Sequence, residues 1–300
     1  MPEKDRPSPK SHNVPPEHPV VQNSRLGSPA VFVSLGLGDS MHAMTNPDSK
    51  PRGIVTACVL IIGNEILSGR TQDTNLNHLA RVLGGWGIQI REARVIPDID
   101  TVIIETVQTI RSQYDYIFTT GGIGPTHDDI TAECMARAFD VPLVQNEAIA
   151  ARIRVRPAPP DIMASRLRMA QIPEGAVLID NPTGGPQGFR IGNVHVMAGI
   201  PSIMQAMLSS LEHELEHGDI VSSCSVTAYL GESQIAAAFS AVQQRYPDFD
   251  LGSYPFFRND KYGTNLVIRG VDKNRMANAL EDVKAVIVAA GGVPENIVFE

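Results

Sequence analysis

The stretch TTGGIGPTHDD at residues 119–129 combines three glycines and a proline with two adjacent aspartates. It directly follows residues 114–118, an apolar run that is typical of a buried strand. In an open α/β sheet, ligands bind beyond the carboxyl ends of the strands. A glycine-rich loop at such an end exposes backbone N–H groups, which favour an anion. The stretch therefore predicts an anion-binding loop that also carries two carboxylates.

The small residues of this loop have a predicted role. The glycines are expected to let the backbone approach a ligand closely and to adopt positive φ. The proline fixes one φ and leaves little room for a plain turn. The alternative is a strand-to-helix turn in which one aspartate only caps the next helix. The candidate ligand contacts in the loop are Thr120, Gly121, Gly122, Gly124, Pro125, Thr126 and Asp128.

The distribution of lysine limits how a phosphate could be bound. No lysine occurs from residue 51 to residue 260, which excludes a Walker-type phosphate site because that site requires one. A phosphate must then be neutralised by backbone amides, arginine or a metal ion. Two carboxylates repel an anion unless a divalent cation bridges them or one of them is protonated. Asp128 and Asp129 are therefore predicted to be metal ligands or acid–base groups in phosphoryl chemistry.

Three regions differ in their sequence patterns. Residues 1–52 are rich in Pro, Ser and Asn, which predicts a disordered tail. Residues 53–220 alternate apolar strands with amphipathic helices, which predicts an α/β domain: three layers, with a mostly parallel sheet covered on both faces. Its last helix is expected over 201–217. Residues 221–300 follow a βαββα order with a possible last strand, typical of a small ferredoxin-like α+β domain.

The composition of the chain limits its possible binding partners and its cellular compartment. The formal net charge of -8 and the pI near 5.5 disfavour binding to nucleic acid. No apolar segment approaches the roughly 20 residues of a membrane span. Cys58, Cys134 and Cys224 are widely separated and odd in number. They predict buried thiols in a reducing, cytoplasmic compartment.

Five separated motifs point to a known family. They are TTGGIGPTHDDIT at 119–131, GNEILSGRTQDTN at 63–75, VIPD at 95–98, NPTGGPQGF at 181–189 and MAGIPSIM at 197–204. Together with IPEGA at 172–176 and the stretches GESQIA and GSYPFF, they resemble the MoaB/Mog molybdopterin-binding family. The resemblance is closest to the N-terminal part of CinA-type proteins and covers the chain from about Ile54 onward.

The resemblance implies catalytic residues and an activity. Mog-type adenylyltransferases use two aspartates, which match Asp98 and Asp129 here. Asp128 stands where the Mog signature usually has a basic residue, as in CinA-type sequences, and this disfavours molybdopterin adenylylation. CinA-type domains are associated with hydrolysis of ADP-ribose and related pyrophosphates that depends on a divalent metal such as Mg²⁺, Mn²⁺ or Co²⁺. The implied function is therefore a nucleotide pyrophosphatase. The alternatives are a molybdopterin-binding or adenylyltransferase protein and a non-catalytic nucleotide-binding module.

Full-length CinA proteins also carry a C-terminal amidase domain that acts on nicotinamide mononucleotide. This sequence leaves no room for it, so that activity is not expected. Relatives form dimers or trimers, so the resemblance implies a homo-oligomer that binds a small phosphorylated ligand, either a nucleotide or a pterin.

Loops after other strands are expected on the same rim of the sheet as the quoted stretch. A solvated loop charge is the alternative for Glu65, and helix capping explains Asn75 as well as a ligand contact does. The glycines of NPTGGPQGF suit a loop that closes over a ligand, or a plain connection. The further ligand-binding candidates on this rim are Gly63, Glu65, Ser68, Gly69, Asn75, Gly199, Pro201 and Ser202.

One competing motif is HELEH at 213–217, which matches the zinc-protease pattern HExxH. On a helix, its two histidines would share one face. The favoured interpretation is the last turn of an amphipathic helix before Gly218, where histidines interact well with the helix dipole.

Overall fold

The structure is a computed structural model that describes residues 53–258 and 260–300. The tail expected over 1–52 lies outside the described residues. Within the described ranges, no helix is both long enough and apolar enough to cross a membrane.

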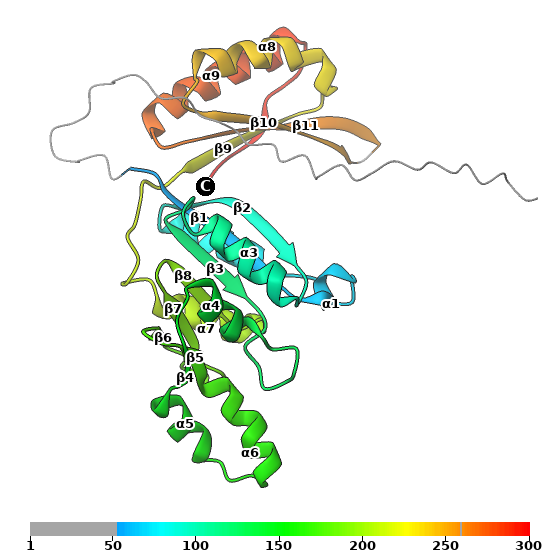
Figure 1. Cartoon of the computed structure of the whole chain (residues 1–300). Coiled ribbons are helices and arrows are strands. Elements are labelled where there is room, and N and C mark those ends of the chain that lie inside the picture. Colours follow the sequence, from blue (N-terminus) through cyan, green and yellow to red (C-terminus); the bar gives the residue numbers. More distant parts are fainter. Residues whose placement is uncertain (1–52, 259) are drawn as a thin grey trace, which may run out of the picture. The chain divides into compact units, whose positions relative to one another are not determined.

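A six-stranded sheet organises the first part of the described chain (Figure 1). The strand order is β2-β1-β3-β8-β7-β6. The first four strands are parallel, and β7 and β6 run antiparallel to their neighbours. The sheet is thus mostly parallel, as the sequence predicts. Its strands are β1 (Val55–Ile62), β2 (Ile88–Ile96), β3 (Tyr116–Thr120), β6 (Val177–Ile179), β7 (Gly188–Ile191) and β8 (Val194–Met197).

Helices cover both faces of this sheet because β1 is apolar on both sides. Leu60 and Ile62 pack into a core with α3 and α4, whereas Val59 and Ile61 pack into a second core with α2 and α7. The three-layer architecture expected from the alternating pattern is therefore confirmed. The covering helices are α2 (Asn75–Gly85), α3 (Asp100–Ile110), α4 (Thr131–Ala138) and α7 (Pro201–Ser210).

Some short elements have no counterpart in the sequence-based expectation, which in this region places only helical segments around residues 146–170. β4 and β5 pair as a separate two-stranded sheet. Strands of three or four residues are too short to show a period, which is why the pattern does not reveal them. Gly188 belongs to β7 and not to a closing loop, and a Cβ there would lie 2.7 Å from the Val196 carbonyl oxygen. The short elements are α1 (Asn64–Leu67), β4 (Leu143–Gln145), α5 (Glu147–Arg154), α6 (Pro160–Leu167), the 3₁₀ helix Arg168–Ala170 and β5 (Gln171–Pro173).

The helix expected over 201–217 is shorter than predicted. α7 ends at Ser210, and the following residues form turns. The two histidines of HELEH therefore do not share a helix face. The His217 ring stacks on Trp86 with the centroids 5.8 Å apart, and its Nε2 lies 2.9 Å from the Glu212 carbonyl oxygen. Both the zinc-protease interpretation and the favoured helix-dipole interpretation are wrong, because this stretch is not helical.

The remaining elements form a four-stranded antiparallel sheet with the order β10-β11-β9-β12. The first and second strands in the chain are separated by the third, which is the split βαβ arrangement of ferredoxin-like folds. Its own core packs α8 and α9 against one face of the sheet. The predicted ferredoxin-like order is confirmed, including the last strand. The elements are β9 (Ser222–Ala228), α8 (Glu232–Arg245), β10 (Asp250–Arg258), β11 (Lys261–Gly270), α9 (Lys273–Ala289) and β12 (Glu295–Phe299).

The three cysteines are buried and unpaired, as the sequence predicts. Burial raises the pKa of the Cys58 and Cys134 thiols to about 12. Thiols of such high pKa stay protonated and behave as small apolar side chains.

Candidate functional site

The ends of β1, β3 and β8 meet through their backbones. Gly121 has a φ of 104°, and a Cβ there would lie 2.2 Å from the Ile62 carbonyl oxygen. A Cβ on Gly199 would lie 3.3 Å from the Cα of Gly121. Only residues without a side chain allow this approach. The two glycines therefore bring three loops together at the carboxyl edge of the parallel strands.

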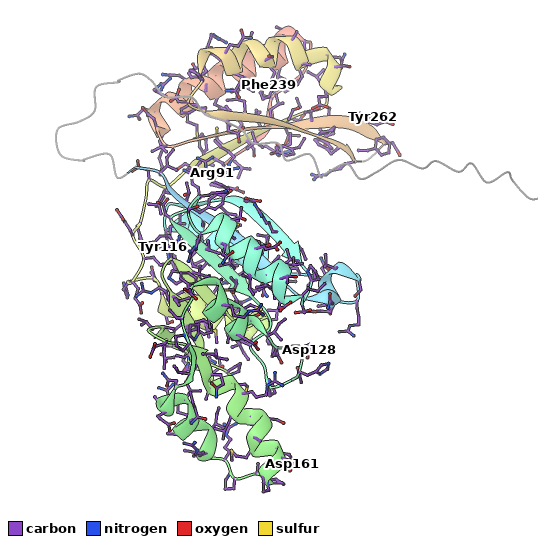
Figure 2. The ribbon with its side chains drawn as sticks, in the orientation of Figure 1. Arg91, Tyr116, Asp128, Asp161, Phe239 and Tyr262 are labelled. Atoms are coloured by element: carbon purple, nitrogen blue, oxygen red, sulfur yellow. The ribbon has the colours of Figure 1, made fainter. Side chains whose placement is uncertain are left out.

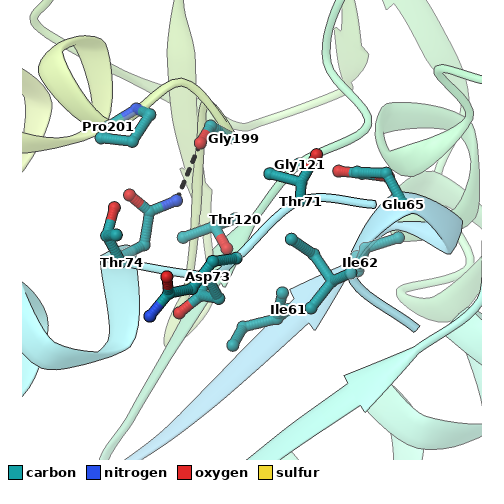
Figure 3. Close-up of a pocket in the computed structure, with 13 residues that line it drawn as sticks. Ile61, Ile62, Glu65, Thr71, Asp73, Thr74, Thr120, Gly121, Gly199 and Pro201 are labelled. Atoms are coloured by element: carbon teal, nitrogen blue, oxygen red, sulfur yellow. Dashed lines mark hydrogen bonds between the residues drawn. The ribbon is translucent and has the colours of Figure 1, made fainter. Parts of the chain in front are cut away.

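A cleft opens at this meeting point (Figure 3). We call it the rim cleft. It brings together six of the residues that the sequence analysis selects from separate motifs: Glu65, Asn75, Thr120, Gly121, Gly199 and Pro201. It also includes residues that the motifs did not single out, namely Ile61, Ile62, Ile66, Thr71, Gln72, Asp73 and Thr74.

The loop between β1 and α2 is held by its own polar groups. The Asp98 Oδ2 atom accepts a hydrogen bond from the Asn64 amide at 2.8 Å, which joins this loop to the end of β2. The Ser68 hydroxyl donates to the Glu65 carbonyl at 3.2 Å, and Gly69 turns the chain with a φ of 72°. The Glu65 side chain is half-buried at the cleft, unlike a freely solvated loop charge.

The contacts at the start of α2 show whether Asn75 caps this helix, which is the alternative to a ligand contact. Asp73 caps this end, since its Oδ1 accepts from the Leu76 amide at 2.9 Å. The Asn75 side chain is 4% exposed, and its Nδ2 donates to the Gly199 carbonyl at 2.8 Å. Asn75 therefore does not act as a helix cap. It ties the first loop to the loop that precedes α7.

The two aspartates of the quoted stretch converge on Thr126. The Thr126 Oγ1 atom lies 2.6 Å from Asp128 Oδ1 and 2.6 Å from Asp129 Oδ2. The Thr126 amide also donates to Asp129 Oδ2, at 2.9 Å. Helix α4 begins only at Thr131, with no side-chain cap, so neither aspartate caps it. Figure 2 shows Asp128 on the loop. The side chains of Asp128 and His127 are both largely exposed, and His127 Nδ1 lies 3.9 Å from Asp128 Oδ1.

Backbone amides accompany these carboxylates. Within the described part of the chain, the N–H groups of Gly122, Ile123 and Gly124 have no hydrogen-bond partner. Gly122 has a φ of 68°, whereas Gly124 does not adopt the positive φ expected of it. Gly124 is small for another reason, because a Cβ there would lie 2.6 Å from Asp129 Oδ2. The loop thus presents free donors beside two acidic groups.

A second cleft lies on the other side of this loop. It is lined by Gly122, Gly124, Asp129, Arg168 and Gln187, among others. Arg152 also donates a hydrogen bond to the Gln187 Oε1 atom. Sequence reasoning missed these arginines because they follow no motif and lie far from the glycine loop in the chain.

Asp98 and Asp129 are not joined by any contact in the described residues. Asp129 lines the second cleft, while the Asp98 carboxylate accepts a hydrogen bond from the Asn64 amide and lines neither cleft. Likewise, no cluster of three or more His, Cys, Asp or Glu side chains in these ranges is arranged to hold a metal ion. A cation near Asp128 and Asp129 would need further ligands from a bound substrate.

Comparison with known proteins identifies the family. Residues 58–217, more than half of the chain, match the model of a probable molybdopterin binding domain. The chain belongs to this family. The resemblance to MoaB/Mog proteins is thereby confirmed. Both clefts lie within this molybdopterin-binding domain. Residues 220–295 match a second model, the middle domain of FAD synthase, which the sequence motifs did not indicate.

Three relatives illustrate the similarity. A protein of Archaeoglobus fulgidus is 30% identical over 230 residues, covering 76% of this chain and 96% of the relative. A CinA-like protein of Syntrophotalea carbinolica is 35% identical over 161 residues, covering 52% of this chain and 39% of the relative, which confirms the CinA resemblance. A probable FAD synthase of Caenorhabditis briggsae is 27% identical over 259 residues, covering 78% and 50%. The chain thus spans half or less of the length of the last two relatives.

Proposed function

We propose that this protein hydrolyses the pyrophosphate bond of a dinucleotide-type substrate, such as ADP-ribose or FAD, with the help of a divalent metal ion. The observation that carries the proposal is the quoted loop, where three free amides lie beside two carboxylates that converge on one hydroxyl. The amides suit the phosphate, and the carboxylates suit the cation.

The backbone of the glycine loop supports the binding of a phosphate. Consecutive free N–H groups in a glycine-rich turn form a concave site for phosphate oxygens. Because residues 51–260 contain no lysine, a phosphate in this loop depends on these amides and on arginine for its hydrogen bonds. Arg168 in the second cleft adds a positive charge on the Asp129 side.

The contacts of the Thr126 hydroxyl support the binding of a cation. A hydroxyl has one proton to donate, yet two carboxylate oxygens lie 2.6 Å from its oxygen. The two carboxylates thus compete for one proton, and a cation between them would reduce their mutual repulsion. The Thr126 hydrogen bond, helped by the nearby His127 and Arg168, holds the pKa of Asp128 below its usual value. Asp128 then stays ionised near neutral pH, so it can bind a cation.

A divalent ion suits this carboxylate pair because Mg²⁺ is commonly held by one or two carboxylates together with substrate phosphates. When bound, such an ion polarises a phosphoryl oxygen and activates water. Asp128 and Asp129 would hold it, and the amides of Gly122 and Gly124 would orient the phosphate. The resemblance to Mog-type proteins makes Asp98 the candidate acceptor for the proton of the attacking water, although Asp98 lines neither cleft. The water oxygen would bond to one phosphorus while the bond from that phosphorus to the bridging oxygen breaks, and the bridging oxygen would leave with the other phosphate, which gives two monophosphates.

The names of the relatives agree with this substrate class. FAD is a dinucleotide with a pyrophosphate linkage, and the chain is similar both to a probable FAD synthase and to the FAD synthase middle domain. These matches cover half of the worm protein's length, so its whole activity does not transfer to this chain.

The alternative proposal is binding of a molybdopterin or a nucleotide without turnover. It is favoured by the family match itself. Both proposals need the same loops, so only measurement of product separates them. Tight binding of ADP-ribose or FAD without release of AMP, with Mg²⁺, Mn²⁺ or Co²⁺ present, would support the alternative.

The first prediction tests the metal role of Asp129. In Asp129→Asn, the Asn Oδ1 can still accept from the Thr126 amide, so the variant should fold normally. Loss of the charge should lower metal-dependent release of AMP from ADP-ribose or FAD by about 10² or more, as is typical for removal of an electrostatic or acid–base group. Affinity for ADP-ribose without metal should be equal or better, because one repelling charge is gone.

Asp161→Asn serves as the matched control, since Asp161 is an exposed aspartate on α6 (Figure 2). It should hydrolyse both substrates at the wild-type rate. Wild-type turnover by both Asp129→Asn and Asp98→Asn would show that the catalytic assignment is wrong.

A further inference from the structure

The Asn75 side chain has an unused acceptor. Its Nδ2 donates to the Gly199 carbonyl, but its Oδ1 is buried and has no hydrogen-bond partner in the described residues. Leaving a buried acceptor unpaired costs about 1–3 kcal/mol. Because Asn75 lines the rim cleft, a bound ligand can supply the missing donor.

The contact with Gly199 fixes which end of the amide faces the ligand. The Gly199 carbonyl can only accept, so the Asn75 nitrogen must point to it, and the unpaired oxygen belongs to a residue that lines the cleft. Rotation of the amide would place two acceptors against each other. Asn75 therefore presents an acceptor only, and a matching ligand group must donate an N–H or O–H.

The charges of the rim cleft disfavour a phosphate at this position. Its lining includes the carboxylates Glu65 and Asp73 and, among the described residues, no lysine or arginine. A pyrophosphate oxygen has no proton to donate. It would therefore be repelled by the Glu65 and Asp73 carboxylates and by the Asn75 oxygen.

Aliphatic side chains complete this part of the cleft. Ile61, Ile62 and Ile66 line it together with Asn75. An apolar wall with one well-placed polar group is typical of sites for flat organic ligands. A heteroaromatic ring that carries an N–H group satisfies both the wall and the acceptor, whereas a sugar hydroxyl satisfies only the acceptor.

We infer that Asn75 is a specificity-determining residue that accepts a hydrogen bond from an N–H group of the ligand's heterocycle in the rim cleft. The phosphates then lie on the other side of Gly121, at the amides of Gly122 to Gly124. This inference rests on the proposed nucleotide function and adds the orientation of the ligand to it.

The test compares two probes on two proteins by calorimetric titration. Asn75→Ala should weaken ADP-ribose binding roughly 10- to 100-fold and leave inorganic pyrophosphate binding unchanged. Asn77→Ala is the matched control, because Asn77 is an exposed asparagine on the same helix that lines neither cleft. It should bind both probes like the wild type.

A second measurement needs no variant. ADP-ribose that carries N6,N6-dimethyladenine lacks the base N–H, so it should bind the wild type about as weakly as unmodified ADP-ribose binds Asn75→Ala. Equal weakening of pyrophosphate in Asn75→Ala, or no effect of dimethylation, would overturn the inference and leave the proposed function standing. Absence of binding of every probe to the wild type would overturn both.

Discussion

Gly121 and Gly69 both adopt positive φ, yet their surroundings differ. A Cβ on Gly121 would collide with the Ile62 carbonyl oxygen at 2.2 Å, whereas a Cβ on Gly69 would meet nothing within 4 Å. Gly121 thus serves two needs, a backbone conformation and a close approach of two strand ends. Gly69 is needed only for the backbone conformation.

At the residue scale, we therefore predict unequal effects of alanine. Gly121→Ala should lower the free energy of unfolding by at least about 2 kcal/mol, because strain and a backbone clash add. Gly69→Ala should cost about 1 kcal/mol from backbone strain alone. Urea unfolding of both variants measures the difference. Equal losses would mean that the strand ends can separate without cost.

At the element scale, β8 carries a histidine in the core. His195 is 1% exposed, and its ring stacks on Phe118 with the centroids 5.1 Å apart. Burial, together with the positive charge of Arg190, lowers the pKa of His195 to about 4. In the unfolded chain its pKa is near 6.5. Between these two values the unfolded chain binds a proton that the folded protein does not.

Stability should therefore fall as the pH drops from 6.5 towards 4. At pH 5 the loss relative to pH 7.5 should be about 2 kcal/mol. His195→Leu removes the titrating group and should remove most of this dependence, even if the leucine changes stability at pH 7.5. Urea midpoints of both proteins at the two pH values provide the measurement. The same slope in the leucine variant would assign acid sensitivity to other groups.

At the scale of the whole molecule, the hydrophobic cores are separate in sequence. Two core clusters draw their buried residues from 55–215, and the third draws them from 224–287. Because no buried residue of one set belongs to the other, each sheet has what it needs to bury its own apolar surface.

We predict that the fragment 53–220 folds alone. It should melt cooperatively and bind ADP-ribose as the full chain does, since both clefts lie within it. The fragment 53–200 is the matched control, because it lacks α7 and with it Met204, Met207 and Leu208 of the core. Circular dichroism melting distinguishes the two. A non-cooperative melt of 53–220 would show that the first sheet depends on the rest of the chain.

Patterns within one segment determined most of the fold. The continuous apolar run of β1 and the periodic helices indicated a covered parallel sheet, and strand order alone indicated the ferredoxin-like part. In a parallel sheet the carboxyl ends of the strands share one edge, so the motifs around Glu65, Gly121 and Gly199 could be placed on one rim. These features depend on local periodicity and on a general rule of sheet geometry.

Only the tertiary structure decided how these groups act together. Asn75 and Gly199 are 124 residues apart in the chain, and their contact determines which atom of the Asn75 amide stays unpaired. The Asp129 side chain likewise contacts Thr126 and lines the second cleft, which the sequence did not predict. α7 ends at Ser210 although its apolar pattern continues to Leu215, because Leu215 reaches the core from a turn. Side-chain direction and helix ends depend on packing between distant segments, which local patterns do not encode.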